Sequence, residues 1–214
     1  MPYRLFYADG SAAMGARVIL EEVGATYELI ETEIGAGRPR APELLAVNPN
    51  GWVPVLLWEH GAIYECGAIV TFLCDRYPEF RLAPAANDAD RGVFLQWLFF
   101  FSSSLQTAYQ MTYHTDRFCA SKEDEDTVQR RSIKRLRELW QVIDNAIGHG
   151  EWMLGQKFSA ADIYLFMLTT WLSDEHGHPS IEEFPNVIRI VDAVVERPSV
   201  RKVYSSFIKE RSEA

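Results

Sequence analysis

The chain has 214 residues, 48% hydrophobic and 13% aromatic, which excludes a disordered chain and allows one large domain or two modest ones. Its net charge of −9 argues against a nucleic-acid-binding or anionic-membrane-binding surface. No apolar run reaches about 18 residues, and the N-terminus lacks the layout of a signal peptide. Cys66, Cys74 and Cys119 have neither metal-like nor C-x-x-C spacing. We therefore expect a cytoplasmic protein with reduced thiols and no nucleic-acid or membrane partner.

The first 80 or so residues alternate between strand and helix patterns. The expected elements, in chain order, are a strand at 3–7, a helix ending at Gly24, a strand at 26–34, a loop at 35–42 with a helical turn at 42–47, a hairpin at 53–65 and a helix at 66–77. This order predicts a small α/β unit with a mixed sheet.

Beyond a proline-broken linker at 78–88, strand signals nearly vanish and apolar residues recur at helical spacing. The predicted helices are 90–118, one through 133–147, 158–172, one before Pro198 and one after it. Segment 158–172 is nearly apolar all round, as a central buried helix would be, and Ser159 with Asp162 has the form of a capping box. We predict an α/β domain over residues 1–79 and an all-helical domain over residues 88–214.

Pro54 stands at the mouth of a predicted strand, inside the stretch "NPNGWVPVL" (48–56). Proline has no N–H to give to a sheet ladder, and Gly51 with two asparagines adds turn chemistry in front of it. Two interpretations follow from the residues. Pro54 is an ordinary turn proline, or the bond before it is cis and presents backbone to a ligand.

A short acidic and histidine-rich segment raises the question of a metal. Asp174, Glu175, His176 and His178 lie in a predicted loop followed by a proline, with no helical or hairpin spacing to bring ligands together. We therefore predict a solvated loop and no metal site. The chain also lacks a phosphate-binding loop, a G-x-S-x-G nucleophile elbow and a dinucleotide fingerprint.

Four motifs together resemble one protein family. "NPNGWVPVL", "YECGAIVTFLCDRYP", "FSAADIYLF" and "RPSV" occur in this order over nearly the whole chain, and the combination resembles the cytosolic glutathione S-transferases of bacterial type. The resemblance implies a thioredoxin-like N-terminal domain that binds glutathione, an all-α C-terminal domain that binds the second substrate, and a homodimer. It implies a transferase of alkyl or aryl groups that serves detoxification, with glutathione as co-substrate and no metal.

The resemblance also implies a glutathione site. It makes the bond before Pro54 cis, with the N–H and C=O of Val53 paired to the cysteinyl backbone of glutathione. Glu65 would bond the γ-glutamyl ammonium, and the N–H groups that begin the next helix would hold its carboxylate. The family usually has Ser or Thr where Cys66 stands. A thiol is a weaker hydrogen-bonding group, so this departure predicts the loss of one side-chain bond.

Two further sets of residues are candidates for ligand contact. The glycyl carboxylate of glutathione needs a cation, which Arg38 or Arg40 would supply unless they are only solvated loop residues. Gln106, Tyr109 and Tyr113 fall at helical spacing off the main apolar stripe, and tyrosines offer an apolar wall with a polar tip. We interpret these three residues as the lining of an electrophile pocket, with a dimer interface or the core as the alternative.

The group that activates the thiol has two candidates. Ser11 resembles the serine of the serine-type classes, whereas the Ser or Cys of some classes would fall on Ala12 or Ala13 and is missing. Tyr7 is the alternative, but if Leu5 faces the core, alternation along the strand sends Tyr7 the same way. We therefore expect Ser11, not Tyr7, to stabilise a thiolate. The null alternative makes Ser11 only a helix cap.

The fold alone does not decide the activity. A conjugating transferase is our leading hypothesis. A non-catalytic binding or scaffold protein, and a glutathione-dependent isomerase or etherase, use the same fold and remain alternatives.

Overall fold

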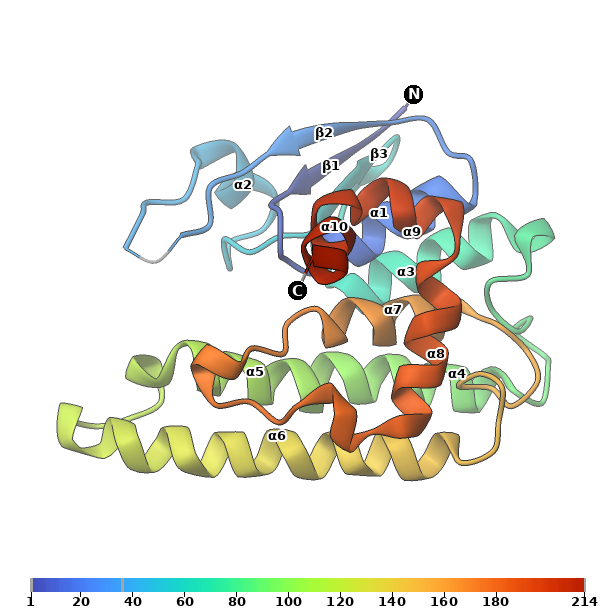
Figure 1. The fold of residues 1–214 in the computed structure, drawn as a ribbon. Coiled ribbons are helices and arrows are strands. Elements are labelled where there is room, and N and C mark those ends of the chain that lie inside the picture. Colours follow the sequence, from blue (N-terminus) through green and yellow to red (C-terminus); the bar gives the residue numbers. More distant parts are fainter. Residues whose placement is uncertain (1, 36, 214) are drawn as a thin grey trace. The chain divides into compact units, whose positions relative to one another are not determined.

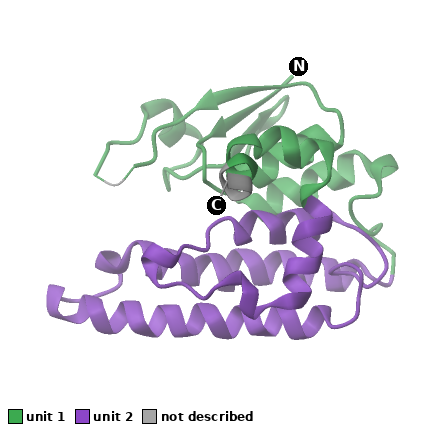
Figure 2. Cartoon of the chain, viewed as in Figure 1, with its two compact units in different colours: residues 1–88, 195–214 green, residues 89–194 purple. Residues whose placement is uncertain are grey.

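The computed structural model describes residues 2–35 and 37–213, which form two compact units. Unit 1 comprises residues 1–88 and 195–214, and unit 2 comprises residues 89–194 (Figure 2). The first break falls at the end of the predicted linker. Residues 195–214, which we expected in the helical domain, group with the first unit instead.

Unit 1 is built on a mixed four-stranded sheet of order β2-β1-β3-β4 (Figure 1). Its strands are β1 (Tyr3–Tyr7), β2 (Tyr27–Glu31), β3 (Val55–Trp58) and β4 (Gly61–Tyr64). Strand β1 runs parallel to β2 and antiparallel to β3, and β3 runs antiparallel to β4. The ends of β1, β2 and β4 and the start of β3 therefore lie at the same edge of the sheet.

Five helices complete unit 1. They are α1 (Ala13–Glu22), α2 (Pro42–Val47), α3 (Cys66–Arg76), α9 (Pro198–Val203) and α10 (Ser205–Glu213). Helix α1 packs against α3 and α9, and its Val18, Ile19 and Leu20 are fully buried. Gly24, with φ of +61°, follows α1 at the predicted C-terminal cap, a position that favours glycine. The predicted helical turn at 42–47 is the short helix α2, begun by a proline in its first turn.

An ion pair joins the end of the chain to α1. The Arg197 guanidinium donates to both carboxylate oxygens of Glu22, at 2.8 and 2.5 Å, and the Ser199 hydroxyl donates to the same carboxylate. Burial would raise the pKa of Glu22, but these hydrogen bonds outweigh it and lower the pKa. Lys202 pairs in the same way with Glu21. These contacts explain why residues 195–214 belong to unit 1.

Unit 2 is helical, as predicted. Its helices are α4 (Arg91–Phe99), a π-helical segment (Phe100–Leu105), α5 (Gln106–Tyr113), α6 (Glu125–Ile147), α7 (Ala160–Thr169) and α8 (Pro185–Val195). The single helix expected at 90–118 is therefore interrupted by a π segment and ends earlier. Among residues 2–35 and 37–213, no helix is both long and apolar enough to cross a membrane.

Helix α7 is buried on all sides and begins with the predicted capping box. The Ser159 hydroxyl accepts from the Ala161 N–H, and the Asp162 carboxylate accepts from the Ser159 N–H at 2.8 Å. Asp162 also accepts from the Met153 N–H at 2.8 Å, which ties the preceding loop to the helix. Burial raises the pKa of Asp162 to about 6, because desolvation of the carboxylate outweighs the hydrogen bonds that favour its charged form.

We expect Asp162 to make stability depend on pH. Because its pKa is raised in the folded state, its contribution is fully present below about pH 4 and is lost as the pH rises to about 6. The free energy of unfolding of the wild type, relative to Asp162→Asn, should therefore fall by about 2 kcal/mol between roughly pH 4.5 and 6.5. Urea unfolding followed by circular dichroism measures both proteins. A difference that stays constant over this range contradicts the assignment.

Candidate functional site

The predicted site residues of the N-terminal domain meet at one edge of the sheet. Val55 of β3 lies opposite Phe6 of β1 and opposite Tyr64 of β4. The residues next along each strand are therefore neighbours: the turn after β1, the loop before β3 and the start of α3. Three segments far apart in the sequence are brought together by strand pairing alone.

The loop before β3 presents unpaired backbone at this edge. The Val53–Pro54 peptide bond is cis, which confirms the prediction made for it. The Asn48 side chain holds the loop by donating to the Trp52 C=O at 2.9 Å and accepting from the Asn50 N–H at 3.2 Å. In the described part of the chain, no hydrogen bond joins the N–H or C=O of Val53 to another residue. An extended ligand could pair there as an added strand does.

The start of α3 carries a strained residue. Glu65 has φ of +72°, one of two described non-glycine residues with positive φ, and its side chain is exposed. A non-glycine residue in this region costs of order 1–3 kcal/mol, and such strain clusters at functional sites. The strain places Glu65 as the N-cap of α3, beside the N–H groups of the first turn. Cys66, which follows it, is a buried thiol.

The two candidate arginines differ in their surroundings. The Arg38 guanidinium lies 3.4 Å from the Glu33 carboxylate, and both side chains are exposed. Arg40 lies over the ring of Trp52, with its guanidinium carbon 4.9 Å from the ring centroid, and donates to the Gly35 C=O at 3.2 Å. Arg40 is therefore held against the loop that contains Pro54, whereas Arg38 is paired with an acidic neighbour.

The Ser11 hydroxyl is engaged within the turn between β1 and α1. It donates to the Ala8 C=O at 2.6 Å and accepts from the Ala13 N–H at 3.2 Å, and the residue is 8% exposed. This is the arrangement of a serine that closes a turn and caps a helix. To donate to a sulfur atom, the hydroxyl must turn away from Ala8.

Tyr7 is buried, as alternation with Leu5 predicts, but its hydroxyl is not directed away from the site. The hydroxyl donates to Oδ1 of Asp9 at 3.0 Å, and the Arg17 guanidinium carbon lies 5.2 Å from the centroid of the Tyr7 ring. Burial raises the pKa of the Tyr7 phenol; Arg17 opposes this shift, and Asp9 adds to it. The phenol therefore acts as a neutral donor whose proton is held by Asp9.

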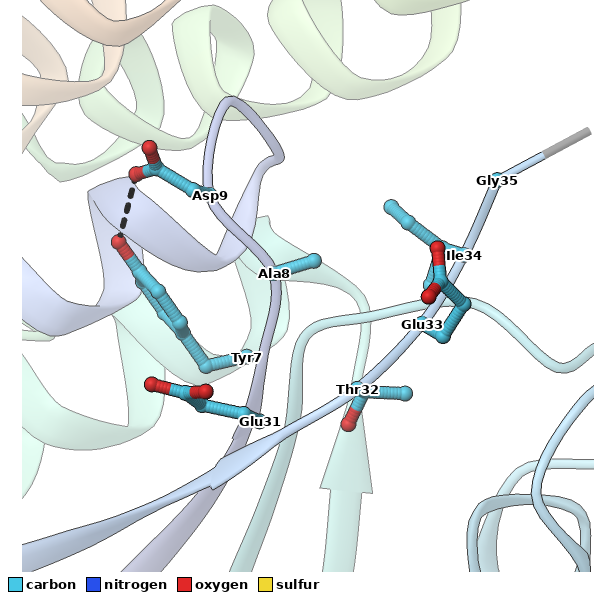
Figure 3. Close-up of a pocket in the computed structure, with 8 residues that line it drawn as sticks. All are labelled: Tyr7, Ala8, Asp9, Glu31, Thr32, Glu33, Ile34 and Gly35. Carbon is cyan, nitrogen blue, oxygen red and sulfur yellow. Dashed lines mark hydrogen bonds between the residues drawn. The ribbon is translucent and has the colours of Figure 1, made fainter.

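A cavity of about 510 Å³ opens where β1 and β2 end (Figure 3). Its lining residues are Tyr7, Ala8, Asp9, Glu31, Thr32, Glu33, Ile34 and Gly35. The volume suits a small organic ligand. Figure 3 shows Tyr7 and Asp9 directed toward each other, with Glu31 on the same side of the strand. Three carboxylates disfavour the anionic groups of a ligand here, and of the sequence-predicted site residues only Tyr7 is part of the lining.

Sequence reasoning missed Asp9 and Arg17. Asp9 precedes Gly10 and reads as a turn residue, and Arg17 reads as a polar position of a helix. The signal that could have found Asp9 is its spacing from Tyr7. Two residues on from an inward tyrosine at a strand end, a carboxylate is within reach of the phenol.

In unit 2, Tyr109 lies in the core. It is 1% exposed, and its hydroxyl donates to the Leu168 C=O at 2.8 Å and accepts from Nε1 of Trp140 at 3.2 Å. This corrects its assignment to a pocket wall in favour of the core alternative, because both hydrogen-bonding directions of the phenol are used inside the unit.

Gln106 and Tyr113 are less buried. The Gln106 side chain accepts from the Tyr164 hydroxyl at 2.7 Å. The Tyr113 hydroxyl donates to the Trp171 C=O at 2.6 Å, and 38% of the residue is exposed. These two residues therefore remain candidates for contact with a ligand.

The segment around His178 is only partly the solvated loop that we predicted. His178 is buried, with Nε2 at 2.9 Å from the Thr112 hydroxyl and Nδ1 accepting from the Ser173 N–H at 3.3 Å. Burial, and then the neighbouring His176, lower its pKa. Among the described residues, no group of three or more His, Cys, Asp or Glu side chains is arranged to hold a metal ion.

Comparisons with known proteins agree with the motifs. Residues 1–75 match the family described as glutathione S-transferase, N-terminal domain, and residues 105–206 match glutathione S-transferase, C-terminal domain. Glutathione S-transferase GstA of Escherichia coli O157:H7 is 27% identical over 95% of this chain and 98% of its own. The transcriptional regulator URE2 of Saccharomyces cerevisiae is 29% identical over 94% of this chain and 67% of its own. A sphingomonad glutathione S-transferase solved with glutathione has a TM-score of 0.82 at 26% identity, over 95% of this chain and 98% of that one.

Tyr109→Phe should destabilise the protein because it leaves two buried groups, the Leu168 C=O and the Trp140 N–H, without their partner. An unsatisfied buried polar group costs about 1–3 kcal/mol, so we expect a loss of roughly 2 kcal/mol or more in the free energy of unfolding. Tyr113→Phe is the matched control and should cost less, since its hydroxyl lies nearer to solvent. Chemical unfolding of both variants tests the core assignment, which fails if the order of the two losses is reversed.

Proposed function

The chain belongs to the glutathione S-transferase family, and we propose that it binds glutathione in unit 1 and conjugates it to a small hydrophobic electrophile. In this reaction the glutathione thiol loses its proton to solvent. The sulfur then forms a bond to an electrophilic carbon, while a leaving group departs or an activated double bond takes up a proton. Detoxification in the cytoplasm, as the family resemblance implies, is part of the same proposal.

The observation that carries the glutathione proposal is the backbone of Val53. Its N–H and C=O have no partner in the described part of the chain, and they lie beside the turn after β1. A cysteinyl residue in extended conformation has one N–H and one C=O to match them. With the cysteinyl backbone paired here, its thiol reaches the turn that contains Ser11.

The two ends of glutathione have matching groups on either side. The γ-glutamyl end would meet Glu65, whose carboxylate suits an ammonium, and the N–H groups of α3, which suit a carboxylate. Cys66 offers a thiol where a hydroxyl would bond better. For the glycyl carboxylate, Arg40 is held beside the Pro54 loop, and Arg38 would have to share its charge with Glu33.

The thiol must be acidified for conjugation. A free thiol titrates near pH 8.5, so only about 3% is ionised at pH 7. Lowering the pKa by about two units makes the thiolate dominant and requires roughly 2.7 kcal/mol of differential stabilisation. In the proposal, the Ser11 hydroxyl turns from the Ala8 C=O to the sulfur as the thiol ionises. The N–H groups at the start of α1 add to this stabilisation.

For the electrophile we propose contacts with the helical unit. Gln106 and Tyr113 of α5 are the remaining candidates, and Tyr109 supports them from the core. A tyrosine beside them offers an apolar face with a polar tip, which suits an aromatic substrate.

One observation favours a second candidate function, a non-catalytic glutathione-binding or scaffold protein. The hydroxyls of Ser11 and Tyr7 both donate to acceptors within the chain, and Ala12 and Ala13 stand where some classes carry Ser or Cys. Turnover with an aryl halide and glutathione separates the two functions. Conjugate formation above the rate in buffer supports the transferase, whereas glutathione binding without turnover supports the second candidate.

Ser11→Ala should raise the pKa of bound glutathione by about 1–2 units, with little change in glutathione affinity. It should also remove about 1 kcal/mol of stability by deleting the cap. The pKa is read from thiolate absorbance in the far ultraviolet as a function of pH, and Ala12→Ser, a conservative change in the same turn, is the control. If stability falls but the thiol pKa does not move, Ser11 is a helix cap and nothing more.

We also propose a homodimer. The family resemblance implies one, and Phe99 on α4 is 67% exposed, which is unfavourable for an aromatic side chain in water. We expect light scattering at micromolar concentration to give twice the chain mass for the wild type and a single chain mass for Phe99→Asp. Val142→Asp, at a residue 48% exposed on α6, is the control and should remain dimeric. A monomeric wild type contradicts the proposal.

A further inference from the structure

The turn between β1 and α1 holds its hydroxyl protons away from any bound thiol. The Tyr7 proton goes to Asp9 at 3.0 Å, and the Ser11 proton goes to the Ala8 C=O at 2.6 Å. Even the Gly10 N–H is directed at a neighbour, Sδ of Met14 at 3.2 Å. Of these acceptors, only Asp9 is ionisable, and it lies beside the cavity at the strand ends.

We propose that Asp9 controls the ionisation of a thiol bound at this turn, by holding the proton of the Tyr7 hydroxyl and by its own negative charge. The inference rests on the proposed glutathione site. Asp9 acts as a positioning residue, because it keeps Tyr7 directed at a carboxylate instead of at the sulfur. Both effects have the same sign: each disfavours the thiolate and raises the pKa of the bound thiol.

The charged groups around Asp9 and Tyr7 do not reverse this sign. Arg17 of α1 lies under the Tyr7 ring, and Glu31 of β2 adds a second carboxylate to the cavity. Tyr204, which follows α9, is buried and close enough to Tyr7, Asp9 and Cys66 for their charges to add to the effect of burial in raising its pKa. Arg17 is thus the one cation among the groups named here, and it faces the ring of Tyr7.

The proposal predicts a graded response to substitution at Asp9. Asp9→Ala removes both the charge and the acceptor, so the Tyr7 hydroxyl is released to donate to the sulfur. Asp9→Asn removes only the charge and keeps an oxygen that Tyr7 can still donate to. The pKa of bound glutathione should therefore fall by about 1–2 units in Asp9→Ala, and by less in Asp9→Asn.

A double-mutant cycle isolates the part that acts through Tyr7. In a Tyr7→Phe background there is no hydroxyl to release, so Asp9→Ala and Asp9→Asn should lower the thiol pKa equally. Glu79→Gln is the charge control. Its residue lies just after α3, where Tyr77 meets Tyr3 at the opposite edge of the sheet, and the thiol pKa should not change.

The measurement is the thiolate absorbance of bound glutathione against pH, after calorimetry has shown that glutathione binds the wild type. Circular dichroism checks that each variant is folded, and Asp9→Asn, which is isosteric, carries the test if Asp9→Ala does not fold. An unchanged thiol pKa in Asp9→Asn or Asp9→Ala overturns the inference and leaves the glutathione site standing. Unequal shifts of the two variants in the Tyr7→Phe background overturn the role of Tyr7. Failure of the wild type to bind glutathione overturns the proposed function and the inference together.

Discussion

The pairing of β1 with its two neighbours is the interaction on which the candidate site depends. Phe6 opposite Val55 sets the Pro54 loop beside the end of β1, and Val55 opposite Tyr64 sets the start of α3 beside the same loop. A slip of one residue would turn every side chain of β1 to the other face of the sheet. Tyr7 would then leave Asp9, and the loop would lose its place beside the turn. The hydrophobic side chains that β1 buries on both faces hold this register.

The fold was predictable because each of its elements carries a local signal. The alternation at 3–7, the glycine after α1 and the capping residues of α7 are visible in the sequence, and family motifs joined them into the correct architecture. The cis bond before Pro54 followed from the same motifs, because the residues alone left an ordinary turn open. The π-helical segment at 100–105 has no comparable local signal, since its apolar spacing continues that of the flanking helices.

The site was predictable in its positions and not in its hydrogen bonds. Which residues approach one edge of a sheet depends on pairing, and pairing can be read from pattern. The direction of a hydroxyl proton depends on acceptors a few ångströms away, and the sequence does not show whether Ser11 faces Ala8 or a ligand. The same limit explains Tyr109, whose helical spacing fits a pocket wall and a core position equally. Its burial depends on Trp140 and Leu168, distant in the sequence.

The ion pair between Glu22 and Arg197 links residues separated by 175 positions, and this has a consequence for the order in which the molecule is assembled. A ribosome adding about 5–20 residues per second needs roughly 9–35 s between these two residues. During that interval α1 has emerged, but the segment that covers it has not yet been made. The first unit therefore cannot reach its final form as a nascent domain. A truncated transcript that ends within the helical unit would produce a chain whose N-terminal half exposes the apolar surface of α1 to chaperones and proteases.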